Sequence, residues 1–226
     1  NLVNLNIEKS IIHITGCPRN DMYFNSTPND KKLLLNNLNI DFKNTKIILF
    51  ASARHQKEYN KFSDGNQLLN FKNDIVECAK SFNNLILIIK PHPLEDVSFL
   101  KKITKKFKNI IVLDKELDIR NFILVSDSFI SLGSTSTFDA IVCNKFIICP
   151  IYGDWYWSKY LMENKSINFV KSKNELFKAF ESVSNDSYLN HVKKFKVERE
   201  KYLEFKVNLI KNSSEIIKNL ILKSLR

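Results

Sequence analysis

Residues 85–93 read LILIIKPHP, and this stretch decides how the chain folds. Five consecutive apolar residues indicate a strand covered on both faces, because a strand with one face in water would alternate apolar and polar side chains. The run ends at Lys90, where the following prolines remove backbone donors and stop the pairing of strands. A strand of this kind belongs to a parallel sheet with helices on both sides.

Further apolar runs lie on either side of this one and alternate with helix-like segments. Strands are predicted at residues 46–51, 85–89, 110–113, 128–132 and 146–149. Helices are predicted at residues 30–38, 67–82, 97–107 and 119–125, and from Gly133 through Val142. This alternation predicts an α/β fold with a doubly wound parallel sheet of the Rossmann-like type.

The chain is expected to have three parts. Residues 1–40 are predicted to be a crossover segment, residues 41–187 a Rossmann-like domain, and residues 188–226 a C-terminal helical extension without strands. Within this extension, residues 193–225 are predicted to form one or two long amphipathic helices. Such helices either pack against the domain or lie on a membrane surface.

Composition and net charge indicate which partners and which cellular location to expect. The 226 residues have a net charge of +11, but the lysines are dispersed and no nucleic-acid-binding motif is present, so no nucleic-acid partner is expected. A basic surface suits an anionic membrane or polymer, and a bias toward Lys, Asn and Ile is the alternative explanation. No apolar run reaches the roughly 18–20 residues of a membrane span, and no signal peptide opens the chain. We therefore expect a cytoplasmic protein, with peripheral contact at the inner membrane face as an option.

The four cysteines contain no CxxC pair, which predicts reduced thiols and no metal site. No HExxH, Walker A or GxGxxG pattern is present, which argues against a zinc protease, a P-loop hydrolase and a dinucleotide dehydrogenase. His13 lies in a strand-like run at residues 11–15, and His191 lies in the predicted C-terminal extension. Both are interpreted as structural or solvent-facing.

The first candidate site is a hydroxyl-rich helix start. Gly133 is followed by four hydroxyl residues, Ser134, Thr135, Ser136 and Thr137. The first N–H groups of a helix have no intrahelical partner and the helix dipole favours an anion, so we interpret the segment as phosphate-binding, with Asp139 in the same first turns. An ordinary helix N-cap is the alternative, although one capping residue would satisfy that need.

Two other strand ends contain candidate ligands. His92 follows strand 85–89 between two prolines that fix its backbone, and its imidazole can bind a phosphate or transfer a proton. Arg54 follows strand 46–51 and can offer a planar fork to a phosphate. Ligands bind beyond the carboxyl ends of strands in an open parallel sheet, so we expect His92 and the hydroxyl residues to share one anion pocket. A proline-turn histidine and a solvated arginine are the alternatives.

Three segments resemble the CDP-glycerol glycerophosphotransferases, which make teichoic-acid-like polymers. Residues 14–21 (ITGCPRND) resemble the family's Gly-x-Pro-Arg-Asn-Asp segment, and residues 90–93 (KPHP) are similar to its Lys-x-His-Pro motif. Ser126-Asp127 and residues 134–139 resemble its segment with paired hydroxyls and Phe-Asp. The resemblance covers residues 11–157, extends in part to bacterial sialyl- and Kdo-transferases, and implies the donor-binding C-terminal half of a GT-B fold, which has two Rossmann-like domains facing a cleft.

The resemblance also implies a function. The donor would be a nucleotide-activated sugar or polyol phosphate of CDP/CMP or UDP type, without a further cofactor, and its nucleotide and phosphates would be held by His92 and residues 134–137. Arg19, Asn20 and Asp21 would lie in the crossover and contact donor or acceptor. The acceptor would be an anionic polymer or lipid-linked chain in capsule, polysaccharide or teichoic-acid synthesis. Because the family's general base comes from an acceptor-side N-terminal domain, we expect that domain outside this chain and assign no catalytic residue here.

Two other functions stay open. Where the family has Asp-Tyr-Ser-Ser, this chain has Leu132 to Thr137 (LGSTST), which leaves room for a nucleotide sugar. A nucleotide-sugar 2-epimerase of the same fold would need carboxylates and an additional histidine in the cleft. The other alternative is a non-catalytic Rossmann-like binding module for a partner or a polyanion.

Overall fold

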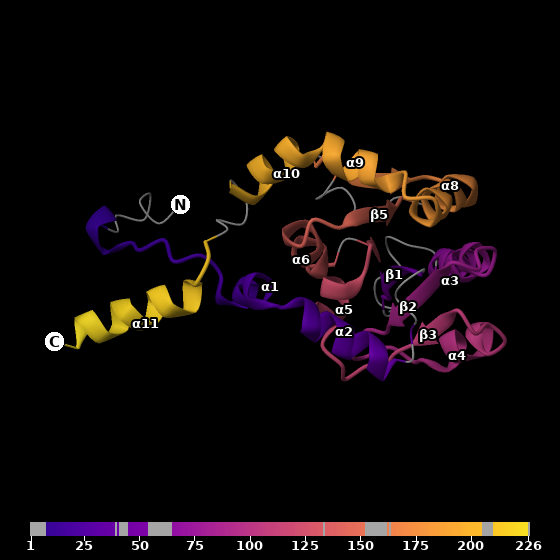
Figure 1. Ribbon diagram of the computed structural model, residues 1–226, viewed down its shortest axis with the longest axis horizontal. Helices are drawn as coiled ribbons and strands as arrows, with labels where there is room; N and C mark the ends of the chain where they lie inside the picture. The colour runs from indigo at the N-terminus through magenta and orange to yellow at the C-terminus, as the bar shows by residue number, and fades with distance from the viewer. Residues whose placement is uncertain are drawn as a thin grey trace.

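The computed structural model describes residues 8–38, 40, 45–53, 65–132, 134–151, 162, 164–204 and 210–225. Within these residues, six strands form one sheet in the order β3-β2-β1-β4-β5-β6, and every neighbouring pair is parallel (Figure 1). The strands are β1 (Lys46–Ala51), β2 (Leu85–Lys90), β3 (Ile110–Val112), β4 (Ser128–Ser131), β5 (Phe146–Pro150) and β6 (Ile167–Val170). The predicted doubly wound parallel sheet is confirmed. Strand β6 was not predicted, because Asn168 interrupts its short apolar run.

Helices connect the strands and cover the sheet. They are α1 (Asp21–Asn25), α2 (Pro28–Asn37), α3 (Gly65–Ala79), α4 (Ser98–Thr104), α5 (Ile119–Val125), α6 (Ser136–Val142), α8 (Lys173–Ser184), α9 (Tyr188–Lys194), α10 (Lys196–Tyr202) and α11 (Ser213–Ser224). The C-terminal extension is helical, as predicted, but its helices α10 and α11 are shorter than the long helices expected over residues 193–225. The helix breaks at Phe195, whose backbone is not helical, and α11 begins after Asn212, which has a φ of 58°. Asparagine tolerates this left-handed conformation better than most residues.

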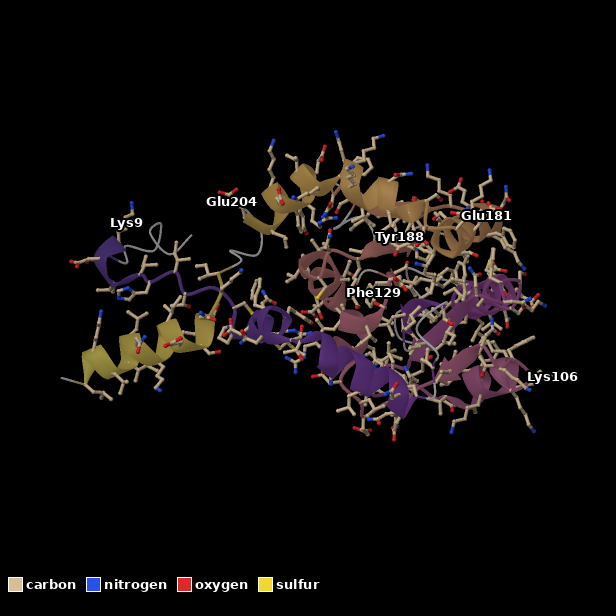
Figure 2. All side chains as sticks on the ribbon, viewed as in Figure 1. Lys9, Lys106, Phe129, Glu181, Tyr188 and Glu204 are labelled. Atoms are coloured by element: carbon tan, nitrogen blue, oxygen red, sulfur yellow. The ribbon has the colours of Figure 1, made fainter. Side chains whose placement is uncertain are left out.

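The core has two parts, one on each face of the sheet. Ile48 and Phe50 of β1 pack with α3, α4 and α8, whereas Ile47 and Leu49 pack with α2, α5 and α6. Successive side chains of a strand point to opposite faces, so a strand with both faces covered is apolar throughout. Figure 2 shows Phe129 of β4 in the interior and Lys106 and Glu181 at the surface.

Helix α9 packs directly on the sheet. Tyr188, at its start, is buried in the core, and its ring lies 5.8 Å from the ring of Phe146 in β5. Leu203, just after α10, is buried in the core on the other face of the sheet. The segment from residue 188 therefore contributes to the same core as the sheet as far as Leu203.

The N-terminal segment and α11 extend away from the sheet side by side (Figure 1). Residues 11–15 are not a strand: Ile11 ends a short 3-10 helix (Lys9–Ile11), residues 12–15 have no regular structure, and Ile11 and Ile14 are 65% and 69% exposed. Asp21 joins this segment to α11 by accepting hydrogen bonds from the N–H of Ser213 at 2.9 Å and from the N–H and hydroxyl of Ser214 at 2.8 and 2.7 Å. Asp21 thus caps the start of α11.

The cysteines form no disulfide. Cys78 and Cys149 are buried, and Cys17 and Cys143 are partly exposed. Burial raises the pKa of the Cys78 thiol to about 12, which keeps it protonated near neutral pH. Across the described ranges, no cluster of His, Cys, Asp and Glu could hold a metal ion. No helix in the same ranges has the length and apolar character to cross a bilayer.

Candidate functional site

The candidate site lies at the carboxyl-terminal edge of the sheet. Ala51, the last residue of β1, pairs with Lys90 of β2 on one side and with Ser131 of β4 on the other, so these three strands end level with each other. The chain runs to β2 and β3 on one side of β1 and returns to β4 on the other side, which makes the β1/β4 boundary the topological switch point where ligands bind in such sheets. His92 and the hydroxyl residues therefore leave the same edge on either side of β1. Their strands are about 10 Å apart, two strand spacings.

The hydroxyl residues form a network that closes the turn between β4 and α6. Ser131 Oγ accepts hydrogen bonds from the Ser134 N–H and from the Thr137 hydroxyl, both at 3.1 Å. The hydroxyls of Ser134 and Ser136 also bond to each other. Ser136 and Thr137 are buried, whereas Ser134 and Thr135 are exposed. The Thr137 hydroxyl thus stabilises the turn, whereas Ser134 and Thr135 form the solvent-facing part of the segment.

This arrangement differs from an ordinary N-cap. Thr135 occupies the N-cap position of α6, and its side chain makes no capping hydrogen bond within the described residues. The N–H of Thr137 bonds instead to the Ser134 carbonyl at 2.9 Å.

Gly133 and Arg54 lie outside the described residues, so their predicted contacts with a donor stay predictions.

The loop after β2 holds His92 in a closed turn. The Glu95 N–H donates to the His92 carbonyl at 2.8 Å, and the His92 N–H donates to Glu95 Oε2 at 3.0 Å. The Leu94 N–H donates to His92 Nδ1 at 3.2 Å. A neutral imidazole whose Nδ1 accepts a hydrogen bond has its proton on Nε2. His92 is exposed, and its Nε2–H can donate a hydrogen bond to an anion.

Lys90 stabilises the same loop through its side chain. Its side chain is buried, and Nζ donates to the carbonyl oxygens of Pro91 and Lys115, each at 2.8 Å. Burial lowers the pKa of this lysine. The lysine of the Lys-Pro-His-Pro segment therefore joins the loops that follow β2 and β3.

A buried ion pair beneath these loops was missed by the sequence analysis. Lys72 Nζ of α3 lies 2.5 Å from Glu95 Oε1, and the two side chains are only 4% and 3% exposed. The signal was a charged residue on the apolar face of α3, since Lys72 follows Phe71 and lies one turn before Ile75. Glu95 gave no comparable signal, because its partner lies 23 residues away.

Arg19 and Asp139, predicted separately, form an ion pair. The guanidinium donates from Nη2 at 2.6 Å and from Nε at 3.2 Å to the two oxygens of the carboxylate, which is buried in the first turn of α6. Burial and the nearby Asp139 raise the pKa of Tyr23 well above its ordinary value. The carboxylate of Asp139 is therefore bound by the crossover segment. Asn20 is buried, and Asp21 caps α11 as described above.

The Ser126-Asp127 segment lies at the opposite edge of the sheet, just before β4 begins. Asp127 accepts hydrogen bonds from the Ile47 N–H at 2.8 Å and from the Tyr188 hydroxyl at 3.1 Å. It thus joins the start of β1 to α9 and does not approach the candidate site.

The remaining described histidines lie elsewhere. His191 is half-buried, with ring centroids 5.2 Å from Phe146 and 4.7 Å from Phe195. Burial lowers its pKa. His13 is exposed in the N-terminal segment.

Comparison with known proteins gives the following matches. A family model described as CDP-glycerol:poly(glycerophosphate) glycerophosphotransferase matches residues 3–223. No curated protein matches. Among solved structures, the wall teichoic acid polymerase TagF has a TM-score of 0.67 at 16% identity over 97% of this chain and 53% of its own. The UDP-GlcNAc 2-epimerase from Neisseria meningitidis has a TM-score of 0.63 at 16% identity over 99% and 58%. WaaG, a glycosyltransferase of lipopolysaccharide biosynthesis, has a TM-score of 0.60 at 10% identity over 89% and 54%. The chain thus spans just over half the length of these similar structures.

Proposed function

The chain belongs to the CDP-glycerol:poly(glycerophosphate) glycerophosphotransferase family, and we propose that its Rossmann-like domain binds the nucleotide and phosphates of an activated donor. The observation that carries this proposal is the register of the sheet. Ala51 is level with both Lys90 and Ser131, so His92 and the exposed hydroxyls of Ser134 and Thr135 flank the switch point together. CDP-glycerol is the donor that the family description favours, and TagF has been determined after soaking with CDPG.

The proposed reaction is a direct displacement at the donor. For a glycerophosphate donor, an acceptor hydroxyl forms a bond to the phosphorus next to glycerol, and the bond from that phosphorus to the nucleotide breaks. Negative charge then develops on the leaving nucleotide phosphate. The His92 Nε2–H and the exposed hydroxyls of Ser134 and Thr135 would donate hydrogen bonds to it, which lowers the barrier because such donors are already oriented. No metal or further cofactor is part of the proposal.

The proposal also includes a domain that binds the acceptor. Since the similar structures are almost twice as long, we propose that a second, acceptor-side domain supplies the general base and binds an anionic polymer or a lipid-linked acceptor. The exposed apolar side chains of the N-terminal segment, of α11 and of the residue that follows it would pack against that domain. They are Ile11, Ile14, Ile221, Leu222 and Leu225. The net charge of +11 would favour an anionic acceptor at a membrane surface.

A thermal-shift screen against CMP, CDP, UDP and GDP tests the donor site. A ligand that binds only the folded state stabilises it, by about 2.7 kcal/mol at a hundredfold excess over the dissociation constant. We expect a selective shift with CDP or CMP, weakened by His92→Ala and by Ser134→Ala. His13→Ala and Ser224→Ala are the matched controls on the N-terminal segment and α11. If both test variants fold and respond to nucleotide like the parent, the site is misplaced.

A nucleotide-sugar 2-epimerase is the second candidate, because the UDP-GlcNAc 2-epimerase has the same fold. That activity would need carboxylates free to act near the donor. Near this edge, Glu95 is bound by Lys72 and Asp139 by Arg19, which favours the transferase. Conversion of UDP-GlcNAc to its 2-epimer without any acceptor would instead establish the epimerase.

A further inference from the structure

Glu95 connects the two loops that border the candidate site. Its Oε1 accepts hydrogen bonds from the Ser52 hydroxyl at 2.8 Å and from Lys72 Nζ at 2.5 Å, and its Oε2 accepts one from the His92 N–H at 3.0 Å. Lys72 Nζ also donates to the Ala53 carbonyl at 2.9 Å. One carboxylate and one ammonium group thus join the chain after β1 to the chain after β2.

Stability alone is a poor reason for this pair. Removing two charges from water costs several kcal/mol for each ion, and apolar residues of similar size often stabilise a protein as well or better. Both side chains are almost fully buried, so this cost applies here. A buried ion pair that also forms a hydrogen bond to a loop at each end is better explained by the loop conformation that it maintains.

The ion pair maintains the conformation of the turn that contains His92. The bond from Glu95 Oε2 to the His92 N–H closes the turn in which the Leu94 N–H reaches His92 Nδ1. That contact keeps the proton of the neutral ring on Nε2, which can then donate a hydrogen bond. Without the carboxylate, the turn loses one of its two closing bonds, and the contact between Leu94 and Nδ1 loses its support.

We propose that Glu95, held in place by Lys72, is a positioning residue that keeps His92 in the Nε2–H form for binding the donor diphosphate. The inference rests on the proposed function for the identity of the ligand, but the state of the His92 ring can be measured without any ligand.

Two variants test the proposal in the whole chain. Glu95→Gln removes the charge and puts an amide group where one carboxylate oxygen accepted a hydrogen bond. The double variant Lys72→Met with Glu95→Leu removes the pair and leaves no unpaired buried charge, so it should fold even if the single variant does not. The matched controls change Glu77 and Lys80 in the same ways, because these residues form an exposed pair at 2.5 Å at the end of the same helix, with Lys80 directly after it.

The first measurement is a two-bond ¹⁵N–¹H spectrum of the histidine rings, recorded above the ordinary histidine pKa, with His92→Ala to assign the signal. The second is CDP binding by calorimetry. We expect the parent and the control variants to show His92 as Nε2–H. Both test variants should show a mixture of tautomers, and their CDP binding should weaken in proportion to the fraction of His92 that loses the Nε2–H form, about twofold for an equal mixture.

The proposal is overturned if a folded test variant keeps the parent tautomer, whatever its affinity, or keeps the parent affinity after the tautomer changes. A double variant that does not fold would also overturn it, because the pair would then support the fold and not the loop. If the parent itself does not bind CDP, the proposed donor fails, and the tautomer measurement alone decides whether Glu95 positions His92.

Discussion

Replacing Gly16 with alanine should detach α11 from the N-terminal segment. Gly16 has a φ of 77°, in the left-handed region that favours glycine. A Cβ at this position would lie 2.5 Å from Ser213 Oγ and 2.8 Å from Ile210 Cβ, well inside van der Waals contact. The substitution therefore combines backbone strain with a steric clash at the start of α11.

The size of the effect follows from these two terms. A left-handed backbone costs a residue with a Cβ about 1–2 kcal/mol, and an added methyl group in a packed contact costs about 1–3 kcal/mol. The sum is about 2–5 kcal/mol. Because the two core clusters of the described structure include no residue of 8–20 or of α11, this cost should fall on the docking of α11 and not on the sheet.

Hydrogen exchange of the amides in α11 measures this docking. A loss of 2 kcal/mol corresponds to about 30-fold faster exchange, and we expect at least that for Gly16→Ala, with exchange in β1 and β4 unchanged. Asn212→Gly is the matched control at the start of α11, because Asn212 has a φ of 58° and glycine relieves that strain. If α11 exchanges equally fast in Gly16→Ala and the parent, the close contact with Ser213 does not hold the segment, and the reasoning is wrong.

Three other substitutions test the domain itself. Since burial lowers the pKa of His191 below its ordinary 6.5, the unfolded state binds the proton more readily, and the melting temperature should fall as pH drops through and below that value. His191→Phe should make the melting temperature depend less on pH between about 5 and 7. If the slope is unchanged, another group causes the pH dependence. Asp127→Ala leaves the Ile47 N–H and the Tyr188 hydroxyl without their acceptor and should cost about 1–3 kcal/mol in urea unfolding, whereas a loss near zero would contradict a role in joining β1 to α9. Phe71→Ala removes a ring that is 1% exposed in the core and should cost about 3–5 kcal/mol by the same measurement.

The sequence was sufficient for the layered architecture. The strands β1, β2 and β5 are buried on both faces, so their apolar character is continuous and visible without coordinates. The two segments most relevant to a donor follow the ends of β2 and β4. In a parallel sheet, strand ends of the same sense meet at one edge, so the shared edge of His92 and Ser134 could be predicted from local patterns and a general rule of topology.

Only the tertiary structure decided which polar residues are partners. Arg19 and Asp139 are 120 residues apart in the chain and Asp21 and Ser213 are 192 apart, and neither pair has a local signal of its contact. The same holds for Lys72 with Glu95, where a lysine on an apolar helix face was visible but its carboxylate partner was not. A charged group is buried only where an opposite charge or several donors reach it, and that condition depends on distances in space, which the order of residues along the chain does not contain.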